Sequence, residues 1–518
     1  MVERAMTQDF DVAIIGYGPV GATLENLLCL LDLRVVILER EHSVFHQPRA
    51  ASFDAEAMRV FQTIGLADAI LPTVRAGRNI RHINADGRLL IRLTRPDTAG
   101  AEGWKGAYRF HQPTTEAMLR KGVERFPRID VRLRTDAYAL DEIEGEVRVR
   151  YENLNSGVLD SVTARYVVGC DGARSTVRRF MGAGLQDLCS HERWIVLDMI
   201  VDGAPETIRY AADEDGNYLD AVQYCDPARP TTYVPMVGNR HRWEFMLLPG
   251  DDPATIAQPE QVWRLLKFWN VGPDRARIER ATVYTFHSAL ATQWRRGNLL
   301  LAGDAAHQTP PFLGQGLCSG IRDAMNLAWK LGAVVAGDAP PSLLDSYESE
   351  RAAHVRSFIE LAVKLGEVIQ ATDPEKAKAR DRELLANPKM LEIVAPPLGP
   401  GLHGEAPPPA GTRSAQPRLA DGRMLDDAVG YRFALLATET MLDWLPRSLR
   451  DELARANVAI VAADGEAGAY LSRLKTEAIV IRPDRAILGV ASTPAELATV
   501  MRLVPSPNMP ALTEGPIR

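Results

Sequence analysis

Cysteine is scarce in this chain, with five residues among 518. The five are scattered, and none of them forms a C-x-x-C pair or a spacing typical of metal sites. This excludes a disulfide framework and a zinc centre built on cysteine, and we predict no metal site. We therefore expect a reducing compartment, the cytoplasm.

Long apolar runs and an excess of positive charge are also lacking. The longest apolar run near the start, Leu27–Leu38, is broken by Asp32 and Arg34. No segment reaches the roughly 20 apolar residues that span a bilayer, and the first ten residues lack the apolar core of a signal peptide. The net charge is -7, with 60 basic and 67 acidic side chains. We therefore expect neither a membrane nor nucleic acid as a partner.

Two catalytic signatures are missing as well. The sequence contains no H-E-x-x-H metalloprotease motif and no G-x-S-x-G nucleophile elbow. What it does have is the balance of a folded protein, with 46% hydrophobic and 25% charged residues. Its length predicts roughly three domains at about 150 residues each.

A glycine-rich motif, residues 16–21 (GYGPVG), lies between a predicted strand at 9–15, whose end 12–15 is apolar, and a helical stretch at 19–31. A second apolar run, 35–38, ends at Glu39. Strand, glycine turn, helix and strand predict a βαβ dinucleotide-binding unit. Its glycines let a pyrophosphate approach the helix N-terminus, and the acid suits a ribose diol. Predicted cofactor contacts here are Gly16, Gly18, Pro19, Val20, Gly21, Glu39 and Arg40.

Two further motifs each follow a predicted strand. One is the run 169–178 (GCDGARSTVR), which contains Asp171. The other is the run 303–307 (GDAAH), which contains Asp304 and is followed by Pro310-Pro311 and by residues 314–316 (GQG). Taken alone, each motif also fits an ordinary loop between a strand and a helix.

Together, in this order and spacing, the three motifs resemble those of the FAD-dependent aromatic hydroxylases, the single-component flavoprotein monooxygenases. The resemblance covers about residues 8 to 370. The nearest group by inspection is the 3-(3-hydroxyphenyl)propionate and 3-hydroxycinnamate hydroxylases, to which residues 300–307 and 320–331 are similar nearly throughout. The resemblance implies FAD as cofactor and NADH or NADPH as co-substrate, without deciding between the two.

The resemblance also assigns roles to single residues. It places Asp304 on the flavin ribityl chain. It links the run 171–178, which begins with Asp171, to the pyrophosphate groups of FAD and of NADH or NADPH. It implies that Arg49 contacts the FAD pyrophosphate and that Gln112 also contacts the cofactor. Arg49 is equally explained as a solvated surface charge, and Gln112 as a helix cap. The residues that would lie along the isoalloxazine ring are Pro311 and the turn Gly314–Leu317, which contains Gly316. Gly303, next to Asp304, is a further implied cofactor contact.

The sequence departs from the family at two places. Cys318 stands where many members have asparagine, which puts one flavin contact in doubt. The related phenol hydroxylases carry an aspartate shortly after the Arg49 position, whereas Asp54 is displaced here. We therefore do not assign a base to Asp54.

The chemistry implied by the resemblance is ring hydroxylation. In the family, O₂ adds to reduced FAD as a C4a-hydroperoxide, whose distal oxygen attacks a phenol. The implied substrate is 3-(3-hydroxyphenyl)propionate or 3-hydroxycinnamate, giving the 2,3-dihydroxy product in a catabolic role. Another phenol, a polyketide or antibiotic substrate, and a non-catalytic flavoprotein remain as alternatives. Candidate bases for the phenol proton are His287, Tyr284 and His111, each of which a structural role would also explain.

The resemblance implies an α/β fold with three parts: a Rossmann-like FAD-binding domain, an inserted β-sheet substrate domain and a C-terminal thioredoxin-like domain. The last part contains no cysteine, which excludes thiol–disulfide chemistry and leaves packing or homodimer formation as its expected use. The predicted boundaries are 8–75, 105–184 and 296–394 for the FAD-binding domain with its helices, 76–104 and 185–295 for the substrate domain, 395–411 for a proline- and glycine-rich linker, and 412–518 for the C-terminal domain.

Overall fold

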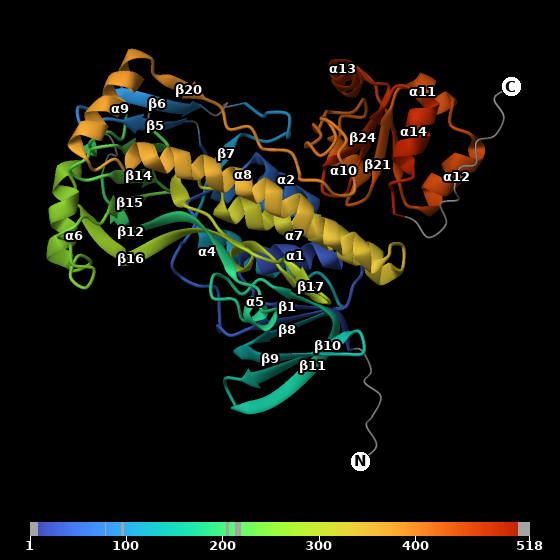
Figure 1. Cartoon of the computed structure of the whole chain (residues 1–518), viewed down its shortest axis with the longest axis horizontal. Coiled ribbons are helices and arrows are strands. Elements are labelled where there is room, and N and C mark those ends of the chain that lie inside the picture. The colour runs from blue at the N-terminus through green and yellow to red at the C-terminus, as the bar shows by residue number, and fades with distance from the viewer. Residues whose placement is uncertain (1–8, 78, 95–97, 204–206, 213–218, 506–518) are drawn as a thin grey trace.

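The computed structural model describes residues 9–77, 79–94, 98–203, 207–212 and 219–505, apart from the side chains of residues 189–191. Two large sheets and a separate C-terminal unit organise these residues (Figure 1). The long helices α7 (Gly316–Ala336) and α8 (Asp345–Ile369) run across the middle of the molecule. Parts of the chain that are distant in sequence therefore meet on these two helices.

The first sheet contains the predicted βαβ unit. Its parallel strands consist largely of apolar residues, because helices cover both faces of such a sheet. In the register, Val12 of the first strand lies opposite Val35 on one side and Tyr166 on the other. Helix α1 (Pro19–Cys29) connects β1 to β2 and packs against α4 (Gln112–Val123) and α7. The strands are β1 (Phe10–Ile15), β2 (Val35–Glu39), β8 (Ile129–Leu133), β9 (Thr135–Ile143), β10 (Glu146–Asn153), β11 (Val158–Gly169), β17 (Arg295–Arg296) and β18 (Leu299–Leu301).

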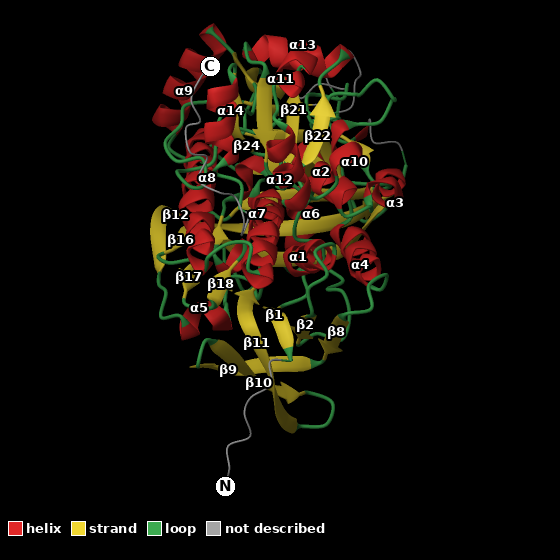
Figure 2. Ribbon diagram, turned by 90° about the vertical axis from the view of Figure 1, so that its right-hand side faces the viewer, coloured by secondary structure: helices red, strands yellow, loops and turns green. Residues whose placement is uncertain are grey.

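The second sheet is assembled from segments far apart in the sequence. Strands β12 and β16 pair along most of their length, and β5 pairs in parallel with β13. Figure 2 shows the long strands β12 and β16 side by side. In spatial order the strands are β19 (His307–Gln308), β16 (Ala276–Ala291), β12 (Leu185–Val201), β15 (Arg240–Met246), β14 (Thr231–Pro235), β13 (Ala221–Tyr224), β5 (Asn79–Ile83), β6 (Leu89–Thr94) and β20 (Lys389–Leu391).

The two faces of the second sheet pack against different partners. One face, with Leu197 and Trp243, packs against α6 (Pro259–Leu266) and the short helix η3 (Lys267–Trp269). The opposite face, with Trp194 and Val234, packs against α8 and the short helix η5 (Pro311–Leu313). Because side chains alternate along a strand, each residue's face follows from its register.

Smaller elements connect the sheets. A short sheet of β3 (Ser52–Asp54), β4 (Arg75–Ala76) and β7 (Ala107–Arg109) lies beside α2 (Ala55–Thr63). The remaining helices before residue 395 are α3 (Ala67–Ile70), η1 (Leu71–Thr73), α5 (Thr176–Phe180), η4 (Gly303–Ala305), η6 (Pro341–Leu344) and α9 (Pro374–Ala386).

The C-terminal unit has its own four-stranded sheet. Strand β21 is parallel to β22 and antiparallel to β23, which in turn is antiparallel to β24. Its elements are α10 (Leu425–Val429), β21 (Ala434–Ala437), α11 (Glu439–Asp443), α12 (Arg447–Arg455), β22 (Ala459–Ala462), α13 (Gly465–Leu474), β23 (Ala478–Ile481), β24 (Ile487–Ala491) and α14 (Pro494–Met501). Before it, the backbone of residues 395–411 contains neither helix nor strand.

Buried ion pairs attach the C-terminal unit to the rest of the molecule. Arg482 donates two hydrogen bonds to Glu350 of α8, at 2.8 and 2.7 Å. Arg59 of α2 donates to Asp426 of α10 at 2.6 Å. All four side chains are almost fully buried. Removing one partner of such a pair leaves a buried charge without its counterion, so each pair strongly disfavours detachment of the unit.

The boundaries of some elements differ from the sequence expectation. Strand β11 begins at Val158 rather than near Tyr166, because its first half pairs with β10 outside the parallel part of the sheet. Strand β15 begins at Arg240, three residues earlier than the apolar pattern indicates. Within the described residues, none of the helices is both long enough and apolar enough to cross a membrane.

Burial of one acid in α1 predicts a pH-dependent stability. Glu25 is fully buried, and burial raises its pKa from 4.5 to about 8. The folded protein therefore keeps a proton that the unfolded chain releases, so the free energy of unfolding falls between these pH values by at most about 1.4 kcal/mol per pH unit. We expect the thermal midpoint of Glu25→Gln to fall less than that of wild type as the pH rises from 5 to 9. The exposed Glu367→Gln is the control, and parallel curves for Glu25→Gln and wild type would contradict the prediction.

Candidate cofactor and substrate site

The turn between β1 and α1 requires glycine at two positions and leaves space at a third. Gly16 has φ +100°, and a Cβ there would lie 2.6 Å from the carbonyl oxygen of Cys170. A Cβ on Gly21 would lie 2.2 Å from the carbonyl oxygen of Gly16. Among the residues that the structure describes, nothing lies within 4 Å of a Cβ on Gly18, and α1 begins after it without a side-chain cap. The turn thus presents open space and a helix N-terminus to an anionic group.

The acid at the end of β2 adjoins this turn. Both carboxylate oxygens of Glu39 accept backbone N–H bonds, from Tyr17 at 2.6 Å and from Glu41 at 2.8 Å. These bonds fix the carboxylate at the carboxyl end of the strand, where each oxygen keeps a further lone pair for a hydroxyl group. The next residue, Arg40, is exposed and pairs with Glu41.

The predicted residues Arg49 and Gln112 lie in direct contact. Gln112 is buried at the start of α4, and its side-chain oxygen accepts the N–H groups of Arg49 at 2.9 Å and Ala50 at 2.8 Å. The Arg49 side chain itself is exposed. Arg242 of β15 donates to the carbonyl oxygens of Pro48 and Arg49. The loop that carries Arg49 is therefore held from α4 and from the second sheet.

The run 169–178 is held by its own side chains. Asp171 accepts the N–H groups of Thr176 at 2.6 Å and Val177 at 3.2 Å. Arg178 donates to the carbonyl oxygen of Ala305 at 2.8 Å, so this loop contacts the run 303–307. Asp171 thus shapes the loop, and burial raises its pKa.

The run 303–307 places one acid outward and ties the rest to the core. Asp304 is exposed between the buried Gly303 and Ala305. The fully buried His307 forms a 2.6 Å hydrogen bond with Asp323 of α7. Asp323 also accepts the N–H of Gly303 at 3.1 Å. The core contacts hold the backbone of the run while the Asp304 carboxylate stays open to a ligand.

The proline–glycine turn, residues 311–317, follows. Gly314 has φ +65°, the left-handed conformation that favours glycine, and it ends η5. Phe312 packs edge-on against Trp194 of the second sheet. Cys318 is buried, and its sulfur lies 3.9 Å from the carbonyl oxygen of Gly314. The turn therefore lies between helix α7 and the face of the second sheet that carries Trp194.

The three candidate bases occupy different environments. His111 precedes α4 and shares a 2.9 Å hydrogen bond with Thr114, and burial lowers its pKa. Tyr284 is half-buried on β16, directly opposite Trp194, and its hydroxyl accepts from Arg280 at 3.3 Å. His287 is exposed on the same strand. Of the three, register places Tyr284 on the face that packs against the proline–glycine turn.

A row of buried polar side chains on that same face was missed by the sequence analysis. His82, Gln223, Thr232 and Glu244 lie directly opposite one another on β5, β13, β14 and β15, all at most 8% exposed. Thr232 donates to Gln223 at 2.6 Å, and both ring nitrogens of His82 lack a partner among the described residues. Strand alternation is the signal for such a row, but only the pairing register aligns its members.

The electrostatics of the row centre on Glu244. Burial raises its pKa, and the nearest described cation is Arg242, at 4.0 Å. Arg242 and Arg280 both pair with Asp198, each at 2.7 Å. Burial also lowers the pKa of His82 to about 4, so this ring is neutral near pH 7. The row thus offers neutral hydrogen-bonding groups and one carboxyl, and its two neighbouring arginines share one counterion, Asp198.

Comparison with known proteins decides the family. A family model described as an FAD binding domain matches residues 9–362. The chain belongs to this FAD-binding family. The match includes the glycine turn, the loop of Asp171 and the run that contains Asp304, so the resemblance drawn from these three motifs is confirmed, as is the prediction of FAD.

Named relatives agree with this assignment over most of the chain. The chain is 35% identical to a probable NADH-specific resorcinol 4-hydroxylase of Rhodococcus jostii (strain RHA1), covering 96% of both chains. It is 38% identical to a 3-(3-hydroxy-phenyl)propionate/3-hydroxycinnamic acid hydroxylase of Mycobacterium avium (strain 104), covering 88% of this chain and 80% of the relative. The predicted enzyme class, an aromatic hydroxylase, is thereby confirmed.

Solved structures confirm the fold. The flavin-dependent monooxygenase PieE, in complex with FAD and substrate, has a TM-score of 0.78 at 21% identity over 95% of this chain and 99% of that one. Aklavinone-11 hydroxylase, with FAD and aklavinone, has a TM-score of 0.78 at 22% identity, over 96% and 99%. The mixed α/β architecture predicted from the sequence is that of these proteins.

The residues present fit FAD, and Gly18 provides a test. Its φ of -69° and ψ of -175° are allowed for alanine, and the added methyl group would meet no atom of the described residues within 4 Å. Gly18→Ala therefore leaves the fold intact but fills space that suits a pyrophosphate. We expect FAD affinity to fall at least about tenfold, or ~1.4 kcal/mol, measured by titrating the apoprotein with FAD. Gly250→Ala, also without neighbours, is the control, and unchanged affinity in Gly18→Ala would refute this placement.

Proposed function

We propose that this chain is an FAD-dependent monooxygenase that uses NADH or NADPH and O₂ to hydroxylate a phenolic ring. The observation that carries the proposal is similarity to a named aromatic hydroxylase across 96% of the chain. That relative is described as NADH-specific, which favours NADH over NADPH here. Bound FAD would supply hydride acceptance and oxygen activation, which no side chain provides.

We propose that the following residues bind the different parts of FAD. The glycine turn and the N-terminus of α1 bind the pyrophosphate, and Glu39 binds the ribose. Asp304, which is exposed beside a firmly held backbone, binds the ribityl chain. Arg49 reaches the pyrophosphate from a loop fixed by Gln112. The predicted contacts at Pro19, Val20, Arg40, Asp171, Gly303, Pro311, Gly314, Gly316 and Leu317 complete this proposal.

For the substrate, the first candidate is 3-(3-hydroxyphenyl)propionate or 3-hydroxycinnamate, converted to the 2,3-dihydroxy product. It is supported by the relatives that carry this name at 35–38% identity. A second candidate is an uncharged phenol such as resorcinol. It is supported by the polar row, because His82, Gln223, Thr232 and the carboxyl of Glu244 suit a phenolic hydroxyl group, and a buried carboxyl disfavours a substrate carboxylate beside it.

Glu244 is the residue that we propose to accept the phenolic proton. A buried carboxyl with a raised pKa becomes a better base near neutral pH. The neutral His82 and Thr232 would orient the hydroxyl group, and the apolar neighbours Trp194 and Val234 would exclude water. His111, Tyr284 and His287 remain candidates for the same step, with Tyr284 favoured by its face.

We also propose the domain assignment given above. Strands β5 and β6 fall in 76–104 and share a sheet with β12–β16, which supports one substrate domain built from two segments. The order β22-β21-β23-β24, with a single parallel pair, supports a thioredoxin-like C-terminal domain. A cytoplasmic location and a homodimer remain part of the proposal.

The first experiment is an oxidation assay with purified protein. We expect NADH oxidation to rise strongly when 3-(3-hydroxyphenyl)propionate or resorcinol is added, with a hydroxylated product identified by mass spectrometry. A larger kcat/KM for resorcinol would favour the uncharged candidate. Stimulation by neither compound, or a colourless protein that takes up no FAD, would contradict the proposal.

A second experiment tests Glu244. Glu244→Gln removes the proton acceptor while keeping the shape, so we expect kcat/KM for the phenol to fall by about 10²-fold, typical of a lost general base. FAD affinity should stay unchanged. Glu260→Gln, in the exposed first turn of α6 on the other face of the sheet, is the matched control. If Glu244→Gln kept the wild-type kcat/KM, another residue would have to accept the phenolic proton.

A further inference from the structure

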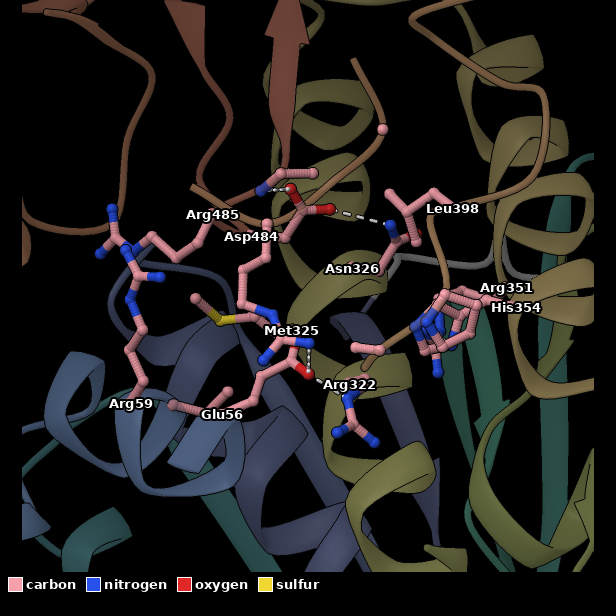
Figure 3. A pocket seen from close by; sticks show the side chains of 16 residues that line it. Glu56, Arg59, Arg322, Met325, Asn326, Arg351, His354, Leu398, Asp484 and Arg485 are labelled. Carbon is pink, nitrogen blue, oxygen red and sulfur yellow. Dashed lines mark hydrogen bonds and ion pairs between the residues drawn. The ribbon is translucent and has the colours of Figure 1, made fainter. Parts of the chain in front are cut away.

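A cavity lies between the C-terminal unit and helices α2, α7 and α8, of which α7 begins at the proline–glycine turn. It has a volume of about 60 Å³ and is lined from α2, α7, α8, the segment that enters the C-terminal unit, and residues 484–486 of that unit. Figure 3 shows Glu56 and Arg322 facing each other in this cavity, with Asp484 joined to Asn326. Charged side chains from two parts of the chain therefore meet in a space that is not filled by apolar packing.

A continuous series of polar contacts runs along this cavity. Arg413 pairs with Oε2 of Glu56 at 2.6 Å. The same oxygen accepts from Nε of Arg322. Arg322 then donates to the side-chain oxygen of Gln315 at 3.0 Å. Gln315 lies inside the proline–glycine turn, directly before α7.

Both ends of the series are firmly anchored. Arg413 pairs with Ala486 in an isolated bridge, and the N–H of Ser414 donates to the carbonyl oxygen of Arg485 at 2.8 Å. Arg413 therefore moves with the C-terminal unit. At the other end Arg322 and Gln315 are buried, and Arg322 also bonds to Asp54, which caps α2.

We propose that Arg413 positions the proline–glycine turn through Glu56 and Arg322, so that the C-terminal unit sets the geometry of the flavin environment. Oε2 of Glu56 connects the two arginines, because it accepts from both Arg413 and Arg322. Removing one arginine therefore changes the position of this carboxylate and the strength of its bond to the other arginine. This rests on the proposed placement of the flavin along residues 311–317. It gives the cysteine-free C-terminal unit a role other than redox chemistry.

The test is Arg413→Gln in the full-length holoprotein. The pairs Arg59–Asp426 and Arg482–Glu350 remain in this variant, so the C-terminal unit stays attached. We expect a changed visible spectrum of bound FAD, and a roughly 2- to 30-fold rise in the ratio of hydrogen peroxide to hydroxylated product, the range typical of coupling between residues. Arg413→Lys keeps the charge and should recover part of the change. Arg423→Gln, an exposed arginine of the same unit, is the control.

A double-mutant cycle separates positioning from general destabilisation. If Arg413 acts through Gln315, the effect of Arg413→Gln on the flavin spectrum should vanish in a Gln315→Ala background. Equal effects in both backgrounds, or a wild-type spectrum in Arg413→Gln, would overturn the proposal. A wild type that binds FAD but hydroxylates no phenol would instead refute the proposed function, while the spectra would still test the positioning.

Discussion

The buried carboxylate of Asp323 is the interaction on which the centre of the molecule depends. It receives hydrogen bonds from the Gly303 N–H, from His307 and from Arg351 of α8, at 3.1, 2.6 and 2.9 Å. These groups hold its pKa below the ordinary value although burial acts in the opposite direction. One side chain of α7 thus joins the run that precedes the proline–glycine turn to α8. Because the charge is fully buried, the arrangement is stable only when all its partners are present.

The second sheet completes the site by providing a wall. Its strands place alternate residues on one face, where apolar groups beside Trp194 surround a short polar row. A buried polar group without a partner costs stability, so the ring of His82, which has no partner in the described part of the chain, is a feature that folding alone would not favour. Such costs are typical of positions retained for binding.

The sequence predicted the nucleotide-binding part well because its signals are local. At Gly16 and Gly21 the backbone geometry admits no side chain, so the motif follows directly from the fold. The polar row was not predictable in the same way, because His82 and Glu244 are far apart in sequence and meet only through the register of four strands. The contact between Arg413 and Glu56 is equally non-local. Gln112 illustrates the intermediate case: its position was predicted, whereas its bond to the backbone of Arg49 required the structure.

The pairing of β20 with β6 has a consequence for how the chain reaches this structure. Lys389 lies opposite Ile91, so the last strand of the second sheet comes from a segment almost three hundred residues after its neighbour. During synthesis the outer edge of β6 therefore remains without a partner until most of the protein has emerged. An unpaired strand edge can bind other chains, and non-local pairing is slow to form. The order of synthesis thus leaves this edge open to association with other chains until β20 has emerged.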